Sequence, residues 1–463
     1  MKKLKISKNE KKPPKASRAA IQALETLGTL VLLEGVFQDA VGNAFIRLLK
    51  WLAKDEAEKP KGLRRYGLLW RALTERQEFT SHPPEGNSLQ DYFLERFLEN
   101  DNAFHRKAEL VPLSQIGPSL SRACLLELEA VQKLLKVDWE AEFLTKAGLS
   151  GKGEVPSLES VVETSGDKSQ SPSAKARKKI KEKLLSESKG NALLAEVAEH
   201  FYQNGWGLFG NYRAFRWENH GGGKGALVGI ESADPIRLEN LVGYDEIRKP
   251  LIENIEAFVS GKLANNVLLY GERGTGKSSH VKALLNAFGD RGLRLVEVHP
   301  DGLKEFPEIL KPLRGRREKF ILFVDDLSFE DNETSYKGLK ALLEGNVEAT
   351  PANVILVATS NRRHLVREFF SEREEGVRKD SEIHGQDTVE EKLSLSDRFG
   401  VVVSFYTPNQ ETYLKIVESW AKVEGIKLPV KELHAQALLW ARQNNGPSGR
   451  TARQFVNHLK GKT

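Results

Sequence analysis

A phosphate-binding loop is the clearest chemical signal in this chain of 463 residues. Residues 266–281 read NVLLYGERGTGKSSHV, which contains the pattern G-x-x-x-x-G-K-S in full. Gly271, Gly274 and Gly276 lack a Cβ atom, so the backbone can curl and aim successive N–H groups at a phosphate. An apolar run before the loop predicts a strand, and a helix predicted to begin near Lys277 adds the positive end of its dipole. The segment therefore predicts nucleotide binding, with a glycine-rich structural turn as the alternative.

Two side chains of this loop have specific predicted roles. The ammonium of Lys277 can reach the β- and γ-phosphates, and the hydroxyl of Ser278 stands where a nucleotide-bound Mg²⁺ needs a ligand. The predicted cofactors are therefore ATP and Mg²⁺. Backbone contacts to the phosphates are expected along the whole loop, which also includes Gly271, Glu272, Arg273, Gly274, Thr275, Gly276 and Ser279.

Two carboxylates follow a second apolar run, KFILFVDDLSFE at residues 319–330. This run predicts a buried strand that places Asp325 at the carboxyl edge of the sheet, where it can hold Mg²⁺ through the water shell. Asp326 stands where a general base would activate the attacking water. Most ATPases of this design carry glutamate there, and aspartate is one methylene shorter, so the base assignment stays open with Glu330 as the weaker candidate. Helix capping by the acidic pair is the alternative.

A third apolar run, NVILVATSN at residues 353–361, ends in polar residues. In a doubly wound sheet that end lies next to the nucleotide. Asn361 could then hydrogen-bond the γ-phosphate or the lytic water, with Thr359 as the alternative candidate. Ordinary turn polarity is the competing explanation.

Two arginines complete the candidate site. Arg398, in LSDRFG, is predicted at the lip of the sheet, from which an arginine can insert into the nucleotide site of a neighbouring subunit. An ordinary salt bridge is its alternative role. Arg450 and Arg453, in GPSGRTARQF, lie three residues apart and hence on one helix face. If a helical lid folds back over the sheet, Arg450 would contact phosphate and distinguish ATP from ADP.

Alternating strands and helices are needed to position these residues, and the chain predicts them from Asp234 onward. Such alternation is typical of an α/β fold with a parallel, doubly wound sheet. Strands are predicted at residues 266–270, 293–298, 320–324, 354–359 and 401–405. Three amphipathic helices, predicted at residues 410–422, 431–443 and 451–459, would form the C-terminal lid. The nucleotide-binding subdomain is placed at residues 226–407 and the lid at 408–463.

The upstream half predicts a different organisation. A mostly α-helical N-terminal domain is placed at residues 21–150, because apolar residues recur at helical spacing within 20–52, 63–78, 89–99 and 120–144. Its aromatic residues, such as those of DYFLERF, are expected in a packed core. Residues 151–190 are rich in Ser, Lys, Glu and Gly and predict a flexible linker. Residues 191–225 predict a helix, a compact aromatic loop and a glycine hinge, HGGGKG.

Charge and composition limit the remaining possibilities. The net charge is +6, but residues 1–20 alone carry +7, so the rest of the chain carries −1. This basic, disordered tail could touch nucleic acid or an acidic partner, although most such tails are simply solvated. The sequence predicts no membrane span and no secretory signal. The single cysteine, Cys124, excludes an internal disulfide and fits a reducing compartment, so a cytoplasmic location is expected.

In their order along the chain, the motifs resemble those of the AAA+ ATPases: phosphate loop, acidic strand, polar sensor strand, arginine finger and helical lid. The preceding segment IRLENLVGYDEIRKPLIENIEAF resembles their entry segment, in which Val242 and Gly243 would lie against adenine. The likeness covers residues 235–459. It implies a five-stranded parallel sheet with a lid, and the pair Asp325 and Asp326 is closer to the replication-initiator and helicase-loader branch than to unfoldases.

A closer resemblance is to an uncharacterised bacterial family of AAA+ ATPases known only as a domain of unknown function. The segments that carry it are YGERGTGKSS, ILFVDDLSFE, YKGLKALLEG, ATSNRRHL, EEKLSLSDRFG and SGRTARQF. This resemblance implies a fold and an activity class, and it implies no substrate. His384 and its acidic neighbours fit no standard set of metal ligands and are interpreted as a surface loop.

These observations predict an ATPase that couples Mg-ATP hydrolysis to a conformational change of an unknown protein or nucleic-acid target. Because Arg398 is useful only in another subunit's site, a homo-oligomer, either a ring or a partial ring, is expected. One alternative is a nucleotide-gated switch or loader with little turnover, possibly associated with DNA. Another is a small-molecule or nucleoside kinase that uses the same loop.

Overall fold

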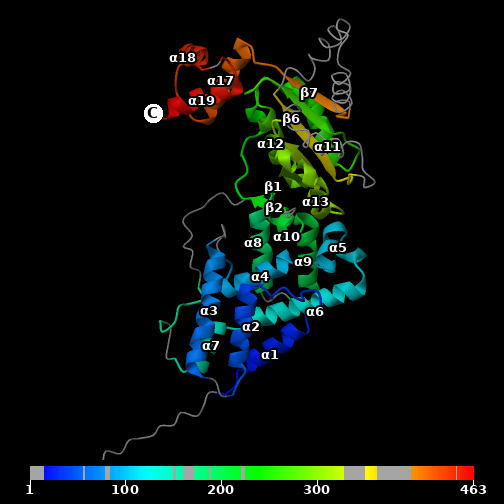
Figure 1. Ribbon diagram of the computed structural model, residues 1–463, viewed down its shortest axis with the longest axis vertical. Coiled ribbons are helices and arrows are strands. Elements are labelled where there is room, and N and C mark those ends of the chain that lie inside the picture. Colours follow the sequence, from blue (N-terminus) through cyan, green and yellow to red (C-terminus); the bar gives the residue numbers. More distant parts are fainter. Residues whose placement is uncertain are drawn as a thin grey trace, which may run out of the picture. The chain divides into compact units, whose positions relative to one another are not determined.

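The structure, a computed structural model, is shown in Figure 1. It describes residues 15–55, 58–78, 84–149, 153–159, 172–186, 189–219, 225–327, 350–361, 398–444 and 446–462. The chain divides into two compact units, Met1–Asn211 and Tyr212–Thr463. Each unit has a hydrophobic core of its own. Among the described helices, none is both long enough and apolar enough to cross a membrane.

The first unit is helical, as predicted. Its elements are α1 (Arg18–Gly28), α2 (Ala40–Leu52), α3 (Lys59–Gln77), α4 (Ser88–Glu99), α5 (Ala103–Leu110), η1 (Leu113–Gln115), α6 (Pro118–Leu135), α7 (Trp139–Ala147), α8 (Pro172–Leu185), α9 (Gly190–Asn204) and α10 (Gly207–Asn211). The stretch 120–144, predicted as one helical region, forms two helices, because Asp138 caps a new helix by accepting the N–H of Ala141 at 3.0 Å. Helix α5 was not predicted.

Aromatic side chains form the centre of this unit. Tyr92, Phe93 and Phe97 of α4 are 1%, 0% and 2% exposed. The ring of Phe45 packs edge-on against Phe93 and Trp139, with both centroid distances at 5.2 Å. Edge-to-face contacts of this kind add to the free energy gained by burying the rings. The prediction that the aromatic residues of DYFLERF form a packed core is confirmed.

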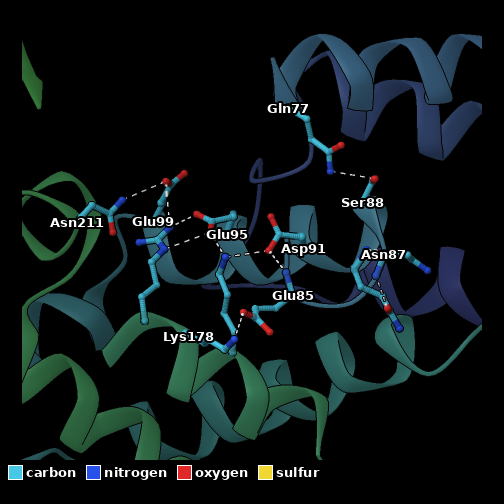
Figure 2. A network of polar contacts seen from close by, with 12 residues as sticks. Gln77, Glu85, Asn87, Ser88, Asp91, Glu95, Glu99, Lys178 and Asn211 are labelled. Atoms are coloured by element: carbon cyan, nitrogen blue, oxygen red, sulfur yellow. Dashed lines mark hydrogen bonds and ion pairs between the residues drawn. The ribbon is translucent and has the colours of Figure 1, made fainter. Parts of the chain in front are cut away.

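Helix α8 contradicts part of the predicted linker, residues 151–190. Its apolar side chains Ile180 and Leu184 are 4% and 1% exposed, so the helix belongs to the core of the first unit. Its basic residues face acidic residues of α4 and the segment before it (Figure 2). Arg177 contacts both Glu95 and Glu99, the latter at 3.3 Å.

Lys181 and Lys178 extend this ion-pair network. Lys181 contacts Asp91 at 2.8 Å and also Glu95, and its side chain is 6% exposed. Lys178 reaches Glu85 at 3.6 Å. The sequence suggested a solvated linker because it is rich in charge. The structure forms a helix there because each of these charges meets an opposite charge on α4 or on the segment before it, far away in the sequence.

The second unit is built around one sheet of seven strands. Its upstream elements are β1 (Ala214–Asn219), β2 (Gly225–Ile230), η2 (Leu238–Asn240), α11 (Asp245–Val259), β3 (Val267–Gly271), α12 (Lys277–Phe288), η3 (Gly289–Arg291), β4 (Leu293–Glu297), η4 (Pro300–Glu305), α13 (Phe306–Leu310) and η5 (Lys311–Leu313). Downstream come β5 (Lys319–Val324), β6 (Val354–Ser360), β7 (Val401–Phe405), α17 (Gln410–Val423), α18 (Val430–Gln443) and α19 (Gly449–Lys460). The strand order is β2-β1-β4-β5-β6-β3-β7.

All five predicted strands are present, and they form five adjacent parallel strands of the sheet, from β4 to β7. The predicted fold class is therefore confirmed. The sheet also has two strands that extend it: β1 lies parallel to β4, and β2 pairs with β1 in antiparallel fashion. The three predicted C-terminal helices are confirmed as α17, α18 and α19, which are grouped together in Figure 1.

Strand β1 corrects the prediction of a compact aromatic loop at residues 205–217. Trp217 on β1 and Tyr212 just before this strand fit there because glycines on the partner strand β2 leave room for their rings. A Cβ atom on Gly225 would lie 2.1 Å from Cζ2 of Trp217, and one on Gly229 would lie 2.3 Å from Cδ2 of Tyr212. Strand β2 begins at Gly225, the last residue of the predicted hinge, whereas residues 220–224 of the hinge lie outside the described part of the chain.

The strand order determines where the predicted site residues meet. Strand β6 lies between β5 and β3, and all three run in parallel. Their carboxyl ends therefore lie side by side at one edge of the sheet. The phosphate loop follows β3, the two aspartates follow β5, and Asn361 follows β6. Three segments that are distant in sequence thus converge.

Candidate functional site

Three glycines shape the loop between β3 and α12. Gly271, Gly274 and Gly276 have φ angles of 142°, 82° and 91°, which side-chain-bearing residues rarely adopt. The constraint at Gly271 is also steric, because a Cβ atom there would lie 1.9 Å from the carbonyl oxygen of Phe405 on β7. The loop ends at Gly276, and α12 begins at the next residue, Lys277. The backbone thus has the curled form and the helix start that the sequence predicted for an anion-binding loop.

Lys277 is held inside this loop by uncharged oxygen atoms. Its side chain is buried, and its Nζ donates to the carbonyls of Gly271 at 2.8 Å and Glu272 at 2.9 Å. A third bond goes to Oδ1 of Asn361, also at 2.8 Å. Burial lowers the pKa of Lys277 to about 8, and the nearby carboxylates of Asp325 and Asp326 act in the opposite direction. The cleft therefore contains a buried cation bonded to dipoles.

Asp325 receives two hydroxyl groups on one oxygen. Oγ of Ser278 and Oγ1 of Thr359 both donate to its Oδ1, each at 2.6 Å. This contact joins the first turn of α12 to the ends of β5 and β6. A hydroxyl and a carboxylate are hard oxygen donors of the kind that Mg²⁺ prefers, so Ser278 and Asp325 fit the predicted metal site.

Asp326 adopts an unusual backbone conformation. Its φ of 53° makes it the only non-glycine residue with positive φ among the described residues. Its N–H donates to Oγ1 of Thr359 at 2.9 Å, and Nδ2 of Asn361 donates to its carboxylate. Left-handed backbone costs free energy for residues other than glycine, and such residues concentrate at functional sites. Asn361 bridges two site residues, because its amide nitrogen donates to Asp326 and its amide oxygen accepts from Lys277.

The lid meets the loop directly. The N–H of Arg450, at the start of α19, donates to the carbonyl of Gly274 at 3.3 Å. A Cβ atom on Gly274 would lie 3.1 Å from Oγ of Ser448 and 3.4 Å from Cβ of Arg450. Ser448 caps α19 by accepting the N–H of Thr451. The lid and the loop are therefore in contact at the point where the phosphates are expected.

An open cleft of about 550 Å³ collects most of the predicted residues. Its lining from the loop and the strand ends comprises Arg273, Gly274, Thr275, Gly276, Lys277, Ser278, Ser279, Asp325, Asp326 and Asn361. The lid contributes Ile416, Trp420, Gly449, Arg450 and Arg453, and the segment before α11 contributes Ile236, Asn240, Leu241, Val242 and Tyr244. The loop and the strand ends thus give the cleft a polar, charged part, and the segment before α11 gives it a largely apolar part.

Four predicted residues do not line the cleft. Gly271 and Glu272 are at the start of the loop, where the Glu272 carbonyl accepts from Thr275 at 2.8 Å and its carboxylate from Thr407. Gly243 packs against the lid, since a Cβ atom there would lie 2.2 Å from Cγ2 of Thr412. Arg398 lies three residues before β7 and away from this cleft.

Other candidates fall outside the described residues. Glu330, the weaker candidate for the base, and His384 are both in that category. Among the described residues, no group of three or more His, Cys, Asp or Glu side chains could hold a metal ion.

The structure also adds residues that sequence reasoning did not identify. Trp420 lines the cleft, and the guanidinium of Arg453 lies 4.8 Å from the centre of its ring. His280 is fully buried on α12, and its Nδ1 bonds to the Gly276 carbonyl at 2.8 Å. Burial lowers the pKa of His280 to about 4, so this imidazole is neutral at pH 7. The spacing of Arg453 from Arg450 was a usable signal, whereas no sequence motif pointed to Trp420.

Comparison with known proteins bears on this site. A family model described as "Protein of unknown function (DUF815)" matches residues 210–463, more than half of the chain. The chain belongs to the DUF815 family. The predicted membership in a family of unknown function is therefore confirmed, and the matched region contains the whole cleft of this DUF815 protein. No curated protein matches the sequence.

Solved structures with similarity to this DUF815 protein include the RuvB Holliday junction branch migration motor of Thermotoga maritima. The identity is 16% and the TM-score 0.34, over 49% of this chain and 65% of that chain. A mutant of the same RuvB gives 17% and 0.34 over the same shares. The chain thus spans less than two thirds of the RuvB length, and a likeness of this extent carries no argument about activity.

Proposed function

We propose that this DUF815 protein binds Mg-ATP and hydrolyses it to ADP and phosphate, and that it couples this cycle to a conformational change of a macromolecular target. One observation carries the proposal: a single cleft collects the residues that such chemistry needs, and they come from four separate elements. These residues are Lys277, Ser278, Asp325, Asp326, Asn361 and Arg450.

The two ends of the cleft suit the two ends of a nucleotide. At the polar end, backbone N–H groups around Gly274 and Gly276 and the ammonium of Lys277 would hold the phosphates. A triphosphate would supply the negative partner that Lys277 needs and would raise its pKa again. At the other end, Val242 and Trp420 offer apolar surface to a flat base.

Ser278 and Asp325 would hold Mg²⁺, which when bound supplies positive charge to the phosphate oxygens. Asp326 would act as the general base and accept a proton from the attacking water. Asn361 already bonds to Asp326, so it is positioned to orient that water next to the base. Lys277 and Arg450 also line the cleft and would stabilise charge that develops on the transferred phosphoryl group.

Arg398 supports an oligomeric form of this proposal. The residue lies away from the cleft of its own chain, as an arginine that serves a neighbouring subunit's site would. We therefore include a homo-oligomer, a ring or partial ring, in the proposed function, with ATP and ADP as ligands and a protein or nucleic acid as the target. A cytoplasmic setting, inferred from the single cysteine, completes the proposal.

Steady-state release of phosphate tests the proposal. Wild-type protein should release phosphate from ATP in a Mg²⁺-dependent manner, and Lys277→Ala and Asp326→Asn should each reduce the rate at least about a hundredfold. Asp326→Asn should still bind ATP, because it keeps the loop and Lys277 intact. If wild type is no faster than Lys277→Ala, the enzymatic part of the proposal fails.

A nucleotide-gated switch with little turnover is the second candidate. It is favoured by the short side chain of Asp326, whose carboxylate is already bonded to Asn361. This candidate predicts normal ATP affinity, ATP-dependent assembly or partner binding, and turnover as low as that of Asp326→Asn. Titration with labelled ATP beside the phosphate assay separates the two candidates.

A further inference from the structure

Thr359 occupies an unusual place in this site. It is 1% exposed, and its hydroxyl makes two bonds at once. The hydroxyl donates to Oδ1 of Asp325 at 2.6 Å and accepts the N–H of Asp326 at 2.9 Å. One side chain therefore contacts both aspartates that were assigned separate roles above.

The main chain of Thr359 adds a third contact. Its carbonyl accepts the N–H of Leu327 at 2.7 Å. In the β5 and β6 register, Val324 is opposite Ala358, so the next pair along the strands is Asp325 and Thr359. Thr359 thus binds three successive residues at the point where the chain leaves β5. The carbonyl bond does not depend on the side chain and would survive a substitution.

We propose that Thr359 is a positioning residue, whose hydroxyl sets the orientation of the metal-binding carboxylate and of the base together. This inference rests on the proposed function, since it assigns Asp325 and Asp326 the roles given there. Thr359 does not line the cleft and therefore acts through the two aspartates. Its hydroxyl is committed to Asp325 and Asp326, so a bond to phosphate, the alternative considered for Thr359 from sequence, is not the role that its geometry supports.

The backbone of Asp326 explains why such a residue is needed. At a φ of 53° the residue is strained unless its surroundings hold it. The bond from its N–H to Thr359 holds the main chain, and the bond from Asn361 holds the carboxylate. The left-handed turn redirects a side chain that is one methylene shorter than glutamate. Thr359 stabilises this turn and so compensates for the shorter base.

The chemistry of the side chain fits this role. A hydroxyl can donate and accept simultaneously, whereas valine has the same shape and can do neither. Branching at Cβ restricts χ1, so threonine holds both bonds with little loss of side-chain freedom. Serine keeps both bonding functions but has a freer rotamer. The inference therefore ranks threonine above serine and both above valine.

The neighbouring residue provides a matched control. Ser360 is also fully buried on β6, and its hydroxyl donates to the Leu327 carbonyl at 3.0 Å. Ser360→Ala removes one buried hydroxyl bonded to the same segment and leaves both aspartate contacts in place. A loss of function caused by general loosening of this segment should therefore appear in both variants.

The experiment compares wild type, Thr359→Val, Thr359→Ser and Ser360→Ala as full-length proteins. Thr359→Val should lower kcat by about tenfold to a hundredfold, with ATP affinity in EDTA unchanged, because the loop is intact. The Mg²⁺ concentration for half-maximal activity should rise, since Asp325 loses its orientation. Thr359→Ser should recover most of kcat, and Ser360→Ala should keep the wild-type kcat and Mg²⁺ requirement. Thermal unfolding checks that each variant folds.

Several results would overturn the inference: a wild-type kcat and Mg²⁺ requirement in Thr359→Val, no recovery in Thr359→Ser, or an equal loss in Ser360→Ala. Failure of the proposed function looks different, because wild type itself would then show no hydrolysis above Lys277→Ala. In that case the gain in ATP affinity on adding Mg²⁺ becomes the readout. Thr359→Val must lose that gain and Ser360→Ala must keep it, or the inference fails.

Discussion

Lys181 in the first unit and Lys277 in the second are both buried, and they show two different ways of using a buried charge. Lys181 on α8 contacts the carboxylates of Asp91 and Glu95, and its side chain is 6% exposed. Lys277 on α12 is 5% exposed, and its ammonium bonds to two carbonyls and one amide oxygen. Burial lowers the pKa of both lysines. The difference between them lies in the partners.

The bonding partners of each ammonium group determine whether its role is structural or functional. The ammonium of Lys181 is neutralised where it stands, so it holds α8 against α4 and adds to the stability of the fold. The ammonium of Lys277 is solvated by dipoles, while the nearest acids, Asp325 and Asp326, are bonded elsewhere. A cation held in this way has a net attraction for an anion that enters the cleft. The first lysine is thus expected to be structural and the second functional.

The largest expected effect follows from replacing Lys277. Lys277→Met should weaken ATP binding by at least about a hundredfold, because the phosphates lose a charge-assisted partner. The midpoint of unfolding should stay the same or rise, because a buried cation without a bonded counterion is replaced by an apolar chain. Labelled-ATP titration and thermal unfolding measure the two quantities.

Lys282 provides the control for this variant, since it lies on the same helix and does not line the cleft. Lys282→Met should leave ATP affinity unchanged. A strong loss of stability in Lys277→Met, with little effect on ATP, would remove the contrast between the two lysines.

The opposite outcome is expected for Lys181. Lys181→Met leaves two carboxylates facing an apolar chain, and breaking a buried pair in this way should destabilise the first unit by about 3 kcal/mol. ATP hydrolysis per folded molecule should not change. Urea unfolding followed by circular dichroism gives the free energy of unfolding.

Lys183 on the same helix is the matched control for an exposed pair. It contacts Glu196 at 3.0 Å, with side chains that are 43% and 38% exposed. Lys183→Met should cost less than about 1 kcal/mol. If the two variants destabilise the protein equally, the ion pairs of Lys181 do not hold α8 in place.

The same contrast explains what could be predicted from the sequence. The five parallel strands were predictable because strands buried on both faces are continuous apolar runs, and the loop was predictable because its glycines have one clear use. Helix α8 was missed because the value of Arg177 and Lys181 depends on acids that are more than 75 residues away. A charged segment of sequence predicts a solvent-exposed segment unless the oppositely charged residues that pair with it can be identified.

The candidate site shows the same limit. Lys277, Ser278 and Asp325 were found because each lies in a motif with fixed spacing. Thr359 was considered only for a bond to the γ-phosphate or the lytic water, because its bonds to the two aspartates depend on β5 and β6 being neighbours, which strand order determines and local sequence does not. Trp420 could not be assigned to the cleft before the lid was placed beside the loop.

The pH dependence of ATP binding gives a smaller effect. The pKa of Lys277 is about 8 in the nucleotide-free protein. Its ammonium is therefore mostly charged at pH 7 and mostly neutral at pH 9, so ATP affinity should fall about tenfold over that range. In Lys277→Arg the guanidinium stays charged, and the slope should disappear even if the affinity itself is lower. A wild-type affinity that is flat from pH 7 to pH 9 would show that the dipoles keep Lys277 charged.

The smallest expected effect concerns the lid, where Arg453 offers a third way of holding a charge. Its guanidinium lies 4.8 Å from the centre of the Trp420 ring, and both residues line the cleft. A guanidinium held over this ring is not bonded to the loop, so Arg453→Ala should weaken ATP binding only about two- to fivefold, which corresponds to about 0.5–1 kcal/mol. Arg450→Ala should cost more, because the main chain of Arg450 is bonded to Gly274, which places this residue next to the loop where the phosphates are expected. If Arg453→Ala costs as much as Arg450→Ala, Arg453 leaves Trp420 when ATP binds and becomes a phosphate contact itself.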